Sequence, residues 1–226
     1  MQPFIQSVNL IPIHQEMQLS QQMAQEIPKS MPLSNDPASL QRVRSLGNRL
    51  VNALPKKEFN YEFHVVNNDT LNAFTIPGGI IYVHSGLLRA ADDAELAGVL
   101  GHEIGHAYYR HPTRSLTRIY GFEYISKLLF KENQGNLKNL VLQITKTGVL
   151  NKYGRDDERE SDTIGYYLVK KAGFPSTGLL RFLRKLQAAE GSSKSTLAFF
   201  STHPPTVERI ARLEALEKAS TQQISL

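Results

Sequence analysis

The sequence predicts a mainly helical α+β fold with one small antiparallel sheet. Three short runs rich in β-branched and aromatic residues, Tyr61–Val66, Asn72–Ile76 and Ile80–His84, are separated by turn sequences and predict the sheet. After Leu88 the apolar residues follow helical spacing almost to the end of the chain. A chain of 226 residues, with 41% hydrophobic and 21% charged residues, has the size and composition of one globular unit.

The segments before the sheet predict two helices joined by a proline-rich connection. A helix is expected over Glu16–Ile27, a linker over Pro28–Pro37, and an amphipathic helix over Ser39–Leu54, where apolar residues recur at helical spacing. We therefore divide the chain into an N-terminal extension, residues 1–38, that packs on the domain, and a main domain, residues 39–226.

The helical part of the chain begins with a capping signal. Asp92 is followed three residues later by Glu95, a pattern typical of a capping box, and a helix with an apolar face follows. Breaks at Gly173–Pro175 and Gly191–Ser193 separate the later helices. Those helices are expected over Gly121–Phe130, Leu137–Leu150, Arg155–Lys171, Thr177–Ala188 and Thr206–Ala219.

The composition excludes several classes of site. The chain has no cysteine, so disulfides, thiol nucleophiles and cysteine-ligated metals are excluded, and a metal site must use His, Asp or Glu. No apolar run approaches the roughly 18 residues that cross a bilayer, and residues 1–19 lack the features of a signal peptide. We therefore expect a chain that lies outside the bilayer.

The chain is basic, with 26 Lys and Arg against 21 Asp and Glu and a pI near 9.3. Such an excess raises nucleic acid and acidic membrane surfaces as partners. The basic residues are spread along the chain, however, and no basic stripe is interleaved with aromatic residues. We therefore expect a solvated basic surface and no nucleic-acid partner.

The capped helix carries two histidines four residues apart, His102 and His106, with Glu103 between them. Four residues correspond to about 400° of helical rotation, so both imidazoles project from one face and can hold one metal ion. Glu103 is offset by about 100°, where a base acting on water beside the metal would lie. Gly101 and Gly105 cost this helix about 1 kcal/mol each relative to alanine, which predicts a close approach of another segment.

A third metal ligand must come from elsewhere, because a catalytic zinc site uses three protein ligands. Glu158 and Asp162 lie four residues apart on one face of a predicted helix. One carboxylate could bind the metal while the other accepts a hydrogen bond from a ligand imidazole. A charged helix facing solvent explains the same spacing, and both interpretations stay open on spacing alone.

Four segments in this order resemble the peptidase family that contains the heat-shock protease HtpX and the CAAX prenyl proteases. The similarity is to its soluble bacterial branch of BepA-like and LoiP-like proteases, and it runs from about Ser39 to about Leu213. One departure is Ser161, where the family usually has alanine, and the small side chain is kept. The four segments are Asn72–Gly79, His102–His106, Glu158–Asp162 and Ser201–Pro205.

The resemblance implies a zincin-like metalloprotease domain whose sheet lies next to the active-site helix. It implies that His102, His106 and Glu158 bind zinc, that Glu103 is the general base, and that Asp162 supports a ligand histidine. Its active site would hydrolyse peptide bonds.

The resemblance also implies a zinc-dependent endopeptidase that acts on extended segments of unfolded or misassembled proteins, in protein quality control of the cell envelope. It implies a periplasmic or envelope-associated location and a peripheral membrane or envelope protein as partner. The alternative is an envelope chaperone or scaffold that retains the metalloprotease fold.

His203 is followed by two prolines, which fix its position just before a helix. Taken alone it is explained by a structural hydrogen bond. The resemblance suggests instead that His203 stabilises the oxyanion or caps the zinc in a resting form, and the sequence does not choose between these roles. The other histidines, which have no partner at ligand spacing, are expected to be structural or exposed: His14, His64, His84 and His111.

The strand before the metal helix predicts a substrate site. An edge strand can pair with an extended polypeptide through main-chain hydrogen bonds and present the scissile bond to the metal. Asn72, Ala73 and Phe74 are the residues expected to do so. The other interpretation is a strand whose side chains fill the core, and the two can hold together.

Overall fold

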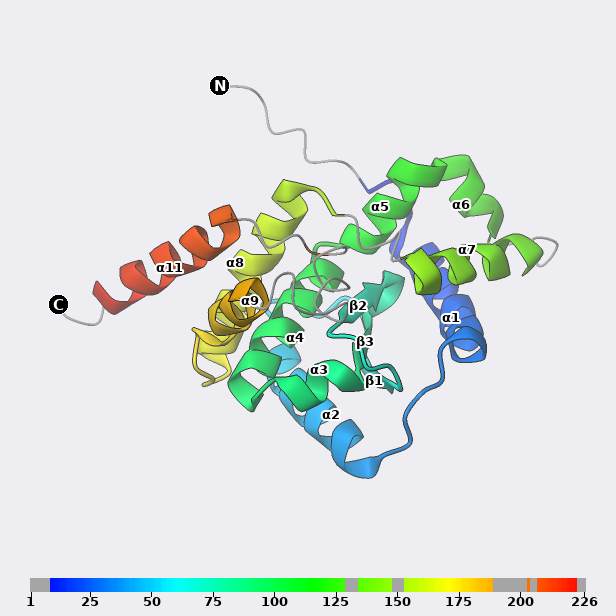
Figure 1. Ribbon diagram of the computed structural model, residues 1–226. Helices are drawn as coiled ribbons and strands as arrows, with labels where there is room; N and C mark the ends of the chain where they lie inside the picture. The colour runs from blue at the N-terminus through cyan, green and yellow to red at the C-terminus, as the bar shows by residue number, and fades with distance from the viewer. Residues whose placement is uncertain (1–8, 129–133, 148–152, 189–202, 204–206, 223–226) are drawn as a thin grey trace, which may run out of the picture.

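The computed structural model describes residues 9–128, 134–147, 153–188, 203 and 207–222 (Figure 1). The predicted break at Gly191–Ser193 and the two prolines after His203 lie outside the described residues. Among the described residues, no helix combines the length and the apolar character needed to cross a membrane.

The described chain is mainly helical with one small sheet, which confirms the predicted fold class. Two helices precede the sheet, α1 (Ile13–Ser30) and α2 (Pro37–Asn52). The first of these runs past Pro28, so the expected linker begins later than the sequence predicts. The strands are β1 (Glu62–Val66), β2 (Ala73–Ile76) and β3 (Ile80–His84), with a 3-10 turn, η1 (Pro77–Gly79), between the last two.

The sheet is mixed rather than purely antiparallel as predicted. Its strand order is β1-β3-β2; β2 is antiparallel to β3, with Phe74 opposite Tyr82, and β1 is parallel to β3, with Glu62 opposite Ile80. The connection after β1 carries the chain across to the far side of β3, so the first and third strands point the same way. The tight turn between β2 and β3 uses Gly78 and Gly79 at φ of +81° and +85°, a region that favours glycine.

The helices after the sheet include two that the sequence did not predict. These are α3 (Ser85–Ala90), which continues directly from β3, and α5 (His111–Tyr120). The second begins after Arg110, which has a φ of 59° and so turns the chain sharply after the helix that carries His102 and His106. The remaining helices are α4 (Asp93–Tyr108), α6 (Phe122–Leu128), α7 (Gln134–Thr147), α8 (Arg155–Lys171), α9 (Gly178–Ala188) and α11 (Val207–Gln222).

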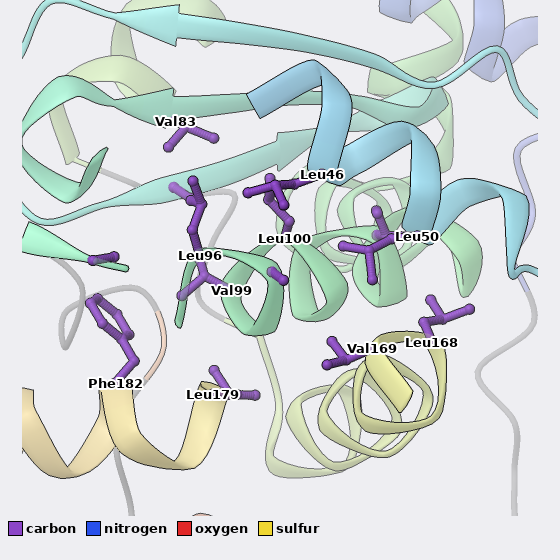
Figure 2. Packing of buried hydrophobic residues seen from close by; sticks show 14 of the residues in the cluster. Leu46, Leu50, Val83, Leu96, Val99, Leu100, Leu168, Val169, Leu179 and Phe182 are labelled. Carbon is purple, nitrogen blue, oxygen red and sulfur yellow. The ribbon is translucent and has the colours of Figure 1, made fainter. Parts of the chain in front are cut away.

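Helix α4 lies at the centre of the main core. Its N-terminus carries the predicted capping box, in which Asp92 accepts from the Glu95 backbone and Glu95 accepts from the Asp92 backbone. Figure 2 shows its apolar residues between the sheet and α2 on one side and α8 and α9 on the other. Labelled there are Leu46 and Leu50 of α2, Val83 of β3, Leu96, Val99 and Leu100 of α4, Leu168 and Val169 of α8, and Leu179 and Phe182 of α9.

A second apolar cluster lies under α1, α5, α6 and α7. Leu19, Met23 and Ile27 of α1 are fully buried against side chains of the sheet, including Ile76 and Tyr82. The carboxylate of Glu16 also joins two turns, because it accepts hydrogen bonds from the Gly78 backbone (3.1 Å) and from Arg110 Nε (2.6 Å). Alternate residues of β3 belong to the two clusters, Ile81 and Val83 to the main one and Ile80 and Tyr82 to the second, so the clusters lie on opposite faces of the sheet.

Glycines on both helices allow α4 and α8 to approach closely. The free-energy cost of Gly101 and Gly105 in a helix predicts such a close approach. A Cβ atom on Gly105 would lie 2.9 Å from the Ser161 carbonyl oxygen, and one on Gly165 would lie 2.9 Å from the Gly101 carbonyl carbon. Side chains at these positions would hold the two helices apart. The contact therefore brings the carboxylates of α8 beside the histidines of α4.

Candidate metal centre

The predicted site residues converge in one buried cluster. Four of them, His102, His106, Glu158 and His203, each offer a ligand atom within 4.8 Å of the others. All three histidines are fully buried, and only 4% of Glu158 is exposed. The alternative of a solvent-facing helix therefore does not describe this face of α8.

The spacing of the ligand atoms fits a tetrahedral metal ion. His102 Nε2 lies 3.0 Å from His106 Nε2. His102 Nε2 lies 3.5 Å from Glu158 Oε2, and His106 Nε2 lies 3.4 Å from Glu158 Oε1. His203 Nδ1 lies 3.2 Å from His102 Nε2 and 3.0 Å from Glu158 Oε1. Four ligands bound at about 2.0–2.1 Å in a tetrahedron are separated by about 3.3 Å, so the donor set fits one ion.

The charges of the cluster also fit a divalent cation. Three carboxylates, Glu103, Glu158 and Asp162, are buried here, and Arg209 is their only ion-pair partner of fixed charge among the described residues. Buried carboxylates without a partner are costly. A dication at the centre would balance the two remaining negative charges.

Charged neighbours keep the carboxylates of α8 ionised. Burial alone would raise the pKa of Glu158, but Arg209 and the surrounding histidines outweigh it and hold that pKa well below its usual value. The pKa of Asp162 is lowered in the same way, against the effect of burial, by Arg209 and His102. Burial holds the pKa of His106 well below its usual value, which leaves a neutral imidazole of the kind that binds metals.

Asp162 and Arg209 hold His102 in place. Asp162 Oδ1 lies 2.9 Å from His102 Nδ1, on the side of the ring away from the cluster. Arg209 donates to both oxygens of Asp162, at 2.8 and 2.7 Å, and lies 2.8 Å from Glu158 Oε2. The sequence predicts this position of Asp162 but did not single out Arg209, whose only signal is a basic residue on the helix after His203.

Glu103 is fully buried and held by a strand residue. Thr75 of β2 lies 2.7 Å from Glu103 Oε2 and 3.0 Å from the Glu103 carbonyl oxygen, and its hydroxyl donates to them. The other carboxylate oxygen, Oε1, lies 3.3 Å from His203 Nε2. The sequence reasoning missed Thr75, although it belongs to the segment that carries the family resemblance.

Two further buried residues surround His106, and neither was predicted to lie here. Tyr153 stacks on its ring with centroids 3.9 Å apart. His111, expected to be structural or exposed, is fully buried with Nδ1 2.8 Å from His106 Nδ1. It lies beyond the end of α4, so helical spacing within that helix could not reveal it.

The residues predicted to bind substrate lie in and beside the edge strand β2. Among the described strands, β2 pairs with β3 alone. Ala73 and Phe74 are buried, and the Phe74 ring stacks on Tyr82 at 5.0 Å. Asn72 immediately precedes the strand, and its carbonyl accepts from the His84 backbone at 2.9 Å. The Phe74 side chain is therefore used in packing, and only main-chain groups would remain for pairing with a peptide.

Comparison with known proteins finds relatives that are named as proteases. Residues 37–217 match the model of peptidase family M48. The chain is 31% identical over 210 residues to the beta-barrel assembly-enhancing protease of Escherichia coli K12, covering 88% of this chain and 43% of that protein. It thus spans less than half the length of that relative.

Two other relatives are similar over a shorter region. The metalloprotease YcaL of Escherichia coli K12 is 31% identical over 169 residues, which cover 74% of this chain and 63% of that protein. The mitochondrial metalloendopeptidase OMA1 of Schizosaccharomyces pombe is 31% identical over 169 residues, 74% of this chain and 49% of that protein. With a family match that spans most of the chain, this chain belongs to the metallopeptidases of family M48.

Proposed function

We propose that this chain is a zinc-dependent endopeptidase that uses His102, His106 and Glu158 as metal ligands and Glu103 as general base. The observation that carries the proposal is the separation of 3.0–3.5 Å between the ligand atoms of α4 and α8, which is close to the spacing of ligands around one ion. Two imidazoles and a carboxylate form a ligand set typical of catalytic zinc. The intact Glu103 favours a peptidase over a scaffold that only retains the fold.

The chain's own residues supply the proton transfer. When bound, zinc lowers the pKa of water to about 7 and polarises a carbonyl group. Glu103 accepts a proton from the attacking water and delivers it to the leaving nitrogen. Thr75 keeps the carboxylate oriented through its 2.7 Å hydrogen bond. Asp162, itself held by Arg209, keeps His102 oriented.

His203 caps the metal in a resting form. Its Nδ1 lies at the fourth corner of the cluster, which a catalytic site must open to water. This position supports the cap over an oxyanion stabiliser. Substrate binding then requires His203 to leave that corner.

An extended polypeptide is the substrate, paired with β2 through the main chain near Asn72, Ala73 and Phe74. Main-chain pairing depends little on sequence, which suits unfolded or misassembled proteins. The relative named for enhancing beta-barrel assembly supports a role in protein quality control of the cell envelope, with a periplasmic location and a peripheral membrane or envelope protein as partner.

The test combines metal analysis with casein hydrolysis. The parent is expected to hold stoichiometric zinc and to cleave casein, and Glu103→Gln is expected to keep the zinc while losing about 100-fold or more in rate. Glu95→Gln is the matched control on the same helix, because glutamine also fits its capping box. A parent without stoichiometric zinc, or a Glu103→Gln variant as active as the parent, would contradict the proposal.

The same assay separates the roles of His203. If His203 is a cap, His203→Ala raises kcat/KM on casein. A fall of about ten-fold or more would make it an oxyanion stabiliser instead. In cells, a Glu103→Gln variant that retains the full cellular effect of the parent would favour the scaffold alternative.

A further inference from the structure

We propose that His111 is a positioning residue of the metal centre, which orients His106 by accepting a hydrogen bond from its Nδ1 and donating one to Glu160. The inference rests on the proposed metal site. It assigns a role to a buried histidine that is not among the proposed metal ligands.

The hydrogen-bonded chain is continuous from the metal ligand to α8. His106 Nδ1 lies 2.8 Å from His111 Nδ1, and His111 Nε2 lies 3.0 Å from Glu160 Oε2. The rings of the two histidines are 4.9 Å apart and inclined at 71°. The ring of Tyr109 stacks on that of His111, with centroids 5.6 Å apart, and helps to fix its plane. Both ring nitrogens of His111 are thus engaged, one on each side.

The direction of the hydrogen bonds follows from the last member. An ionised carboxylate only accepts, so His111 Nε2 carries the proton that it donates to Glu160. A neutral His111 then has an acceptor at Nδ1, and His106 Nδ1 must be the donor. This leaves the lone pair of His106 on Nε2, the atom that faces His102 Nε2 at 3.0 Å.

Arg114 anchors the far end and argues against a second metal site. His111, Asp157 and Glu160 lie close enough together to hold a cation. Arg114 Nη2, however, already donates to Glu160 Oε2 at 3.0 Å and to Asp157 Oδ1 at 2.9 Å. The guanidinium supplies the positive charge that a second ion would bring, and His111 Nδ1 faces His106 instead.

Helix α8 thereby orients both histidines of α4. Asp162 contacts His102 directly, whereas Glu160 acts on His106 through His111. Partners of this kind typically contribute 10–100-fold to metal affinity. The α5 helix, which begins with His111, becomes part of the metal centre.

The test measures zinc affinity by competition with a chelating dye, together with the visible absorption of the cobalt-substituted protein. His111→Phe keeps a ring but removes the acceptor, and it is expected to weaken zinc binding about 10–100-fold and to change the cobalt spectrum. His111→Asn places an oxygen near the position of Nδ1 and is expected to recover most of the affinity. His84→Phe is the matched control, since His84 is also buried but bonds to Thr70, and it should leave the affinity unchanged.

The outcomes distinguish this inference from the proposed function. A parent that binds no zinc contradicts the proposed function itself. A parent that binds zinc while His111→Phe binds it equally tightly overturns only the role of His111, and two ions per parent chain with one in His111→Phe would assign a second metal site. If His111→Phe does not fold, Glu160→Ala is compared with His111→Asn. Glu160→Ala removes the acceptor that sets the hydrogen-bond direction of His111. The proposal therefore requires weaker zinc binding in Glu160→Ala than in His111→Asn, and the opposite order overturns it.

Discussion

His84 shows how a single buried histidine couples stability to pH away from the metal centre. It ends β3, only 4% of it is exposed, and its Nδ1 lies 2.6 Å from the Thr70 hydroxyl. Burial lowers its pKa from 6.5 to about 4. The folded protein therefore holds it neutral where the unfolded chain already takes up a proton.

We predict that this group makes the protein less stable as the pH falls from 6.5 towards 4. Above pH 6.5, His84 is neutral in both the folded and the unfolded state, so it does not change the free energy of unfolding. Between pH 6.5 and 4, His84 takes up a proton only in the unfolded state, which is thereby stabilised. Over this whole pH range the free energy of unfolding is expected to fall by about 3 kcal/mol, with a slope of up to about 1.4 kcal/mol per pH unit. Urea unfolding of the parent and His84→Gln at pH 7, 6 and 5 measures it. The difference between them should change with this slope, and parallel stability curves would contradict the assignment.

At the residue scale, the sequence predicts the members of the cluster that lie on regular helices. The spacing of His102 and His106, and that of Glu158 and Asp162, follows from helical geometry alone. Thr75, Arg209 and His111 could not be predicted in this way, because each reaches the site from another element. Their roles and those of the predicted residues stay proposals until they are tested.

At the scale of elements, the contact between α4 and α8 sets the geometry of the metal centre. A Cβ atom on Gly165 would lie 2.9 Å from two backbone atoms, the Gly101 carbonyl carbon and the His102 nitrogen. Backbone atoms cannot rotate away as a side chain can. Any side chain at Gly165 therefore forces α8 away from α4.

Gly165→Ala is expected to destabilise the fold by about 1–3 kcal/mol and to weaken zinc binding, since it separates Glu158 from the histidines. Gly135→Ala is the control: it makes the same substitution in α7, where no atom of the described residues would lie within 4 Å of the added Cβ. The control should change the free energy of unfolding by less than about 1 kcal/mol, with alanine favoured in a helix. Chemical denaturation and dye competition measure both effects. Equal stability of the two variants would show that the helices tolerate a wider spacing.

The sequence predicts most elements at this scale but not how they pair. Helical periodicity and the capping box define α4 and α8 closely, and β3 has the predicted bounds. The parallel pairing of β1 with β3 depends on where the chain crosses, which no local pattern encodes. The division between residues 1–38 and 39–226 stays a prediction.

For the whole molecule, the candidate metal centre joins His102 and His106 of α4 with Glu158 of α8, His203 and Arg209 of α11. Glu103, Glu158 and Asp162 bring three buried negative charges together, with Arg209 as their partner of fixed charge among the residues described. An ion that binds only the folded state adds to stability by mass action. Without the ion, the burial of these carboxylates destabilises the folded state.

Metal removal is therefore expected to lower the unfolding temperature. Stabilisation by a ligand at 1,000 times its Kd is about 4 kcal/mol, so a tightly bound zinc ion should give a clear shift in calorimetry after treatment with a chelator. Added zinc should restore the transition. Glu103→Gln should show the same shift, because Glu103 is not a proposed ligand, while His106→Ala should show little. A transition unchanged by the chelator in the parent would contradict a structural contribution of the metal.

The sequence by itself determined the fold class, the capped helix with its two histidines and the face of α8 that carries two carboxylates. These features depend on local rules, in which helical rotation places residues four apart on one side. Only the tertiary structure decided which groups meet: Thr75 with Glu103, His111 with His106 and Glu160, and Arg209 with Asp162. The physical reason is that such contacts depend on how closely helices dock, and glycines at the contact between α4 and α8 set that distance through packing rather than through local propensity.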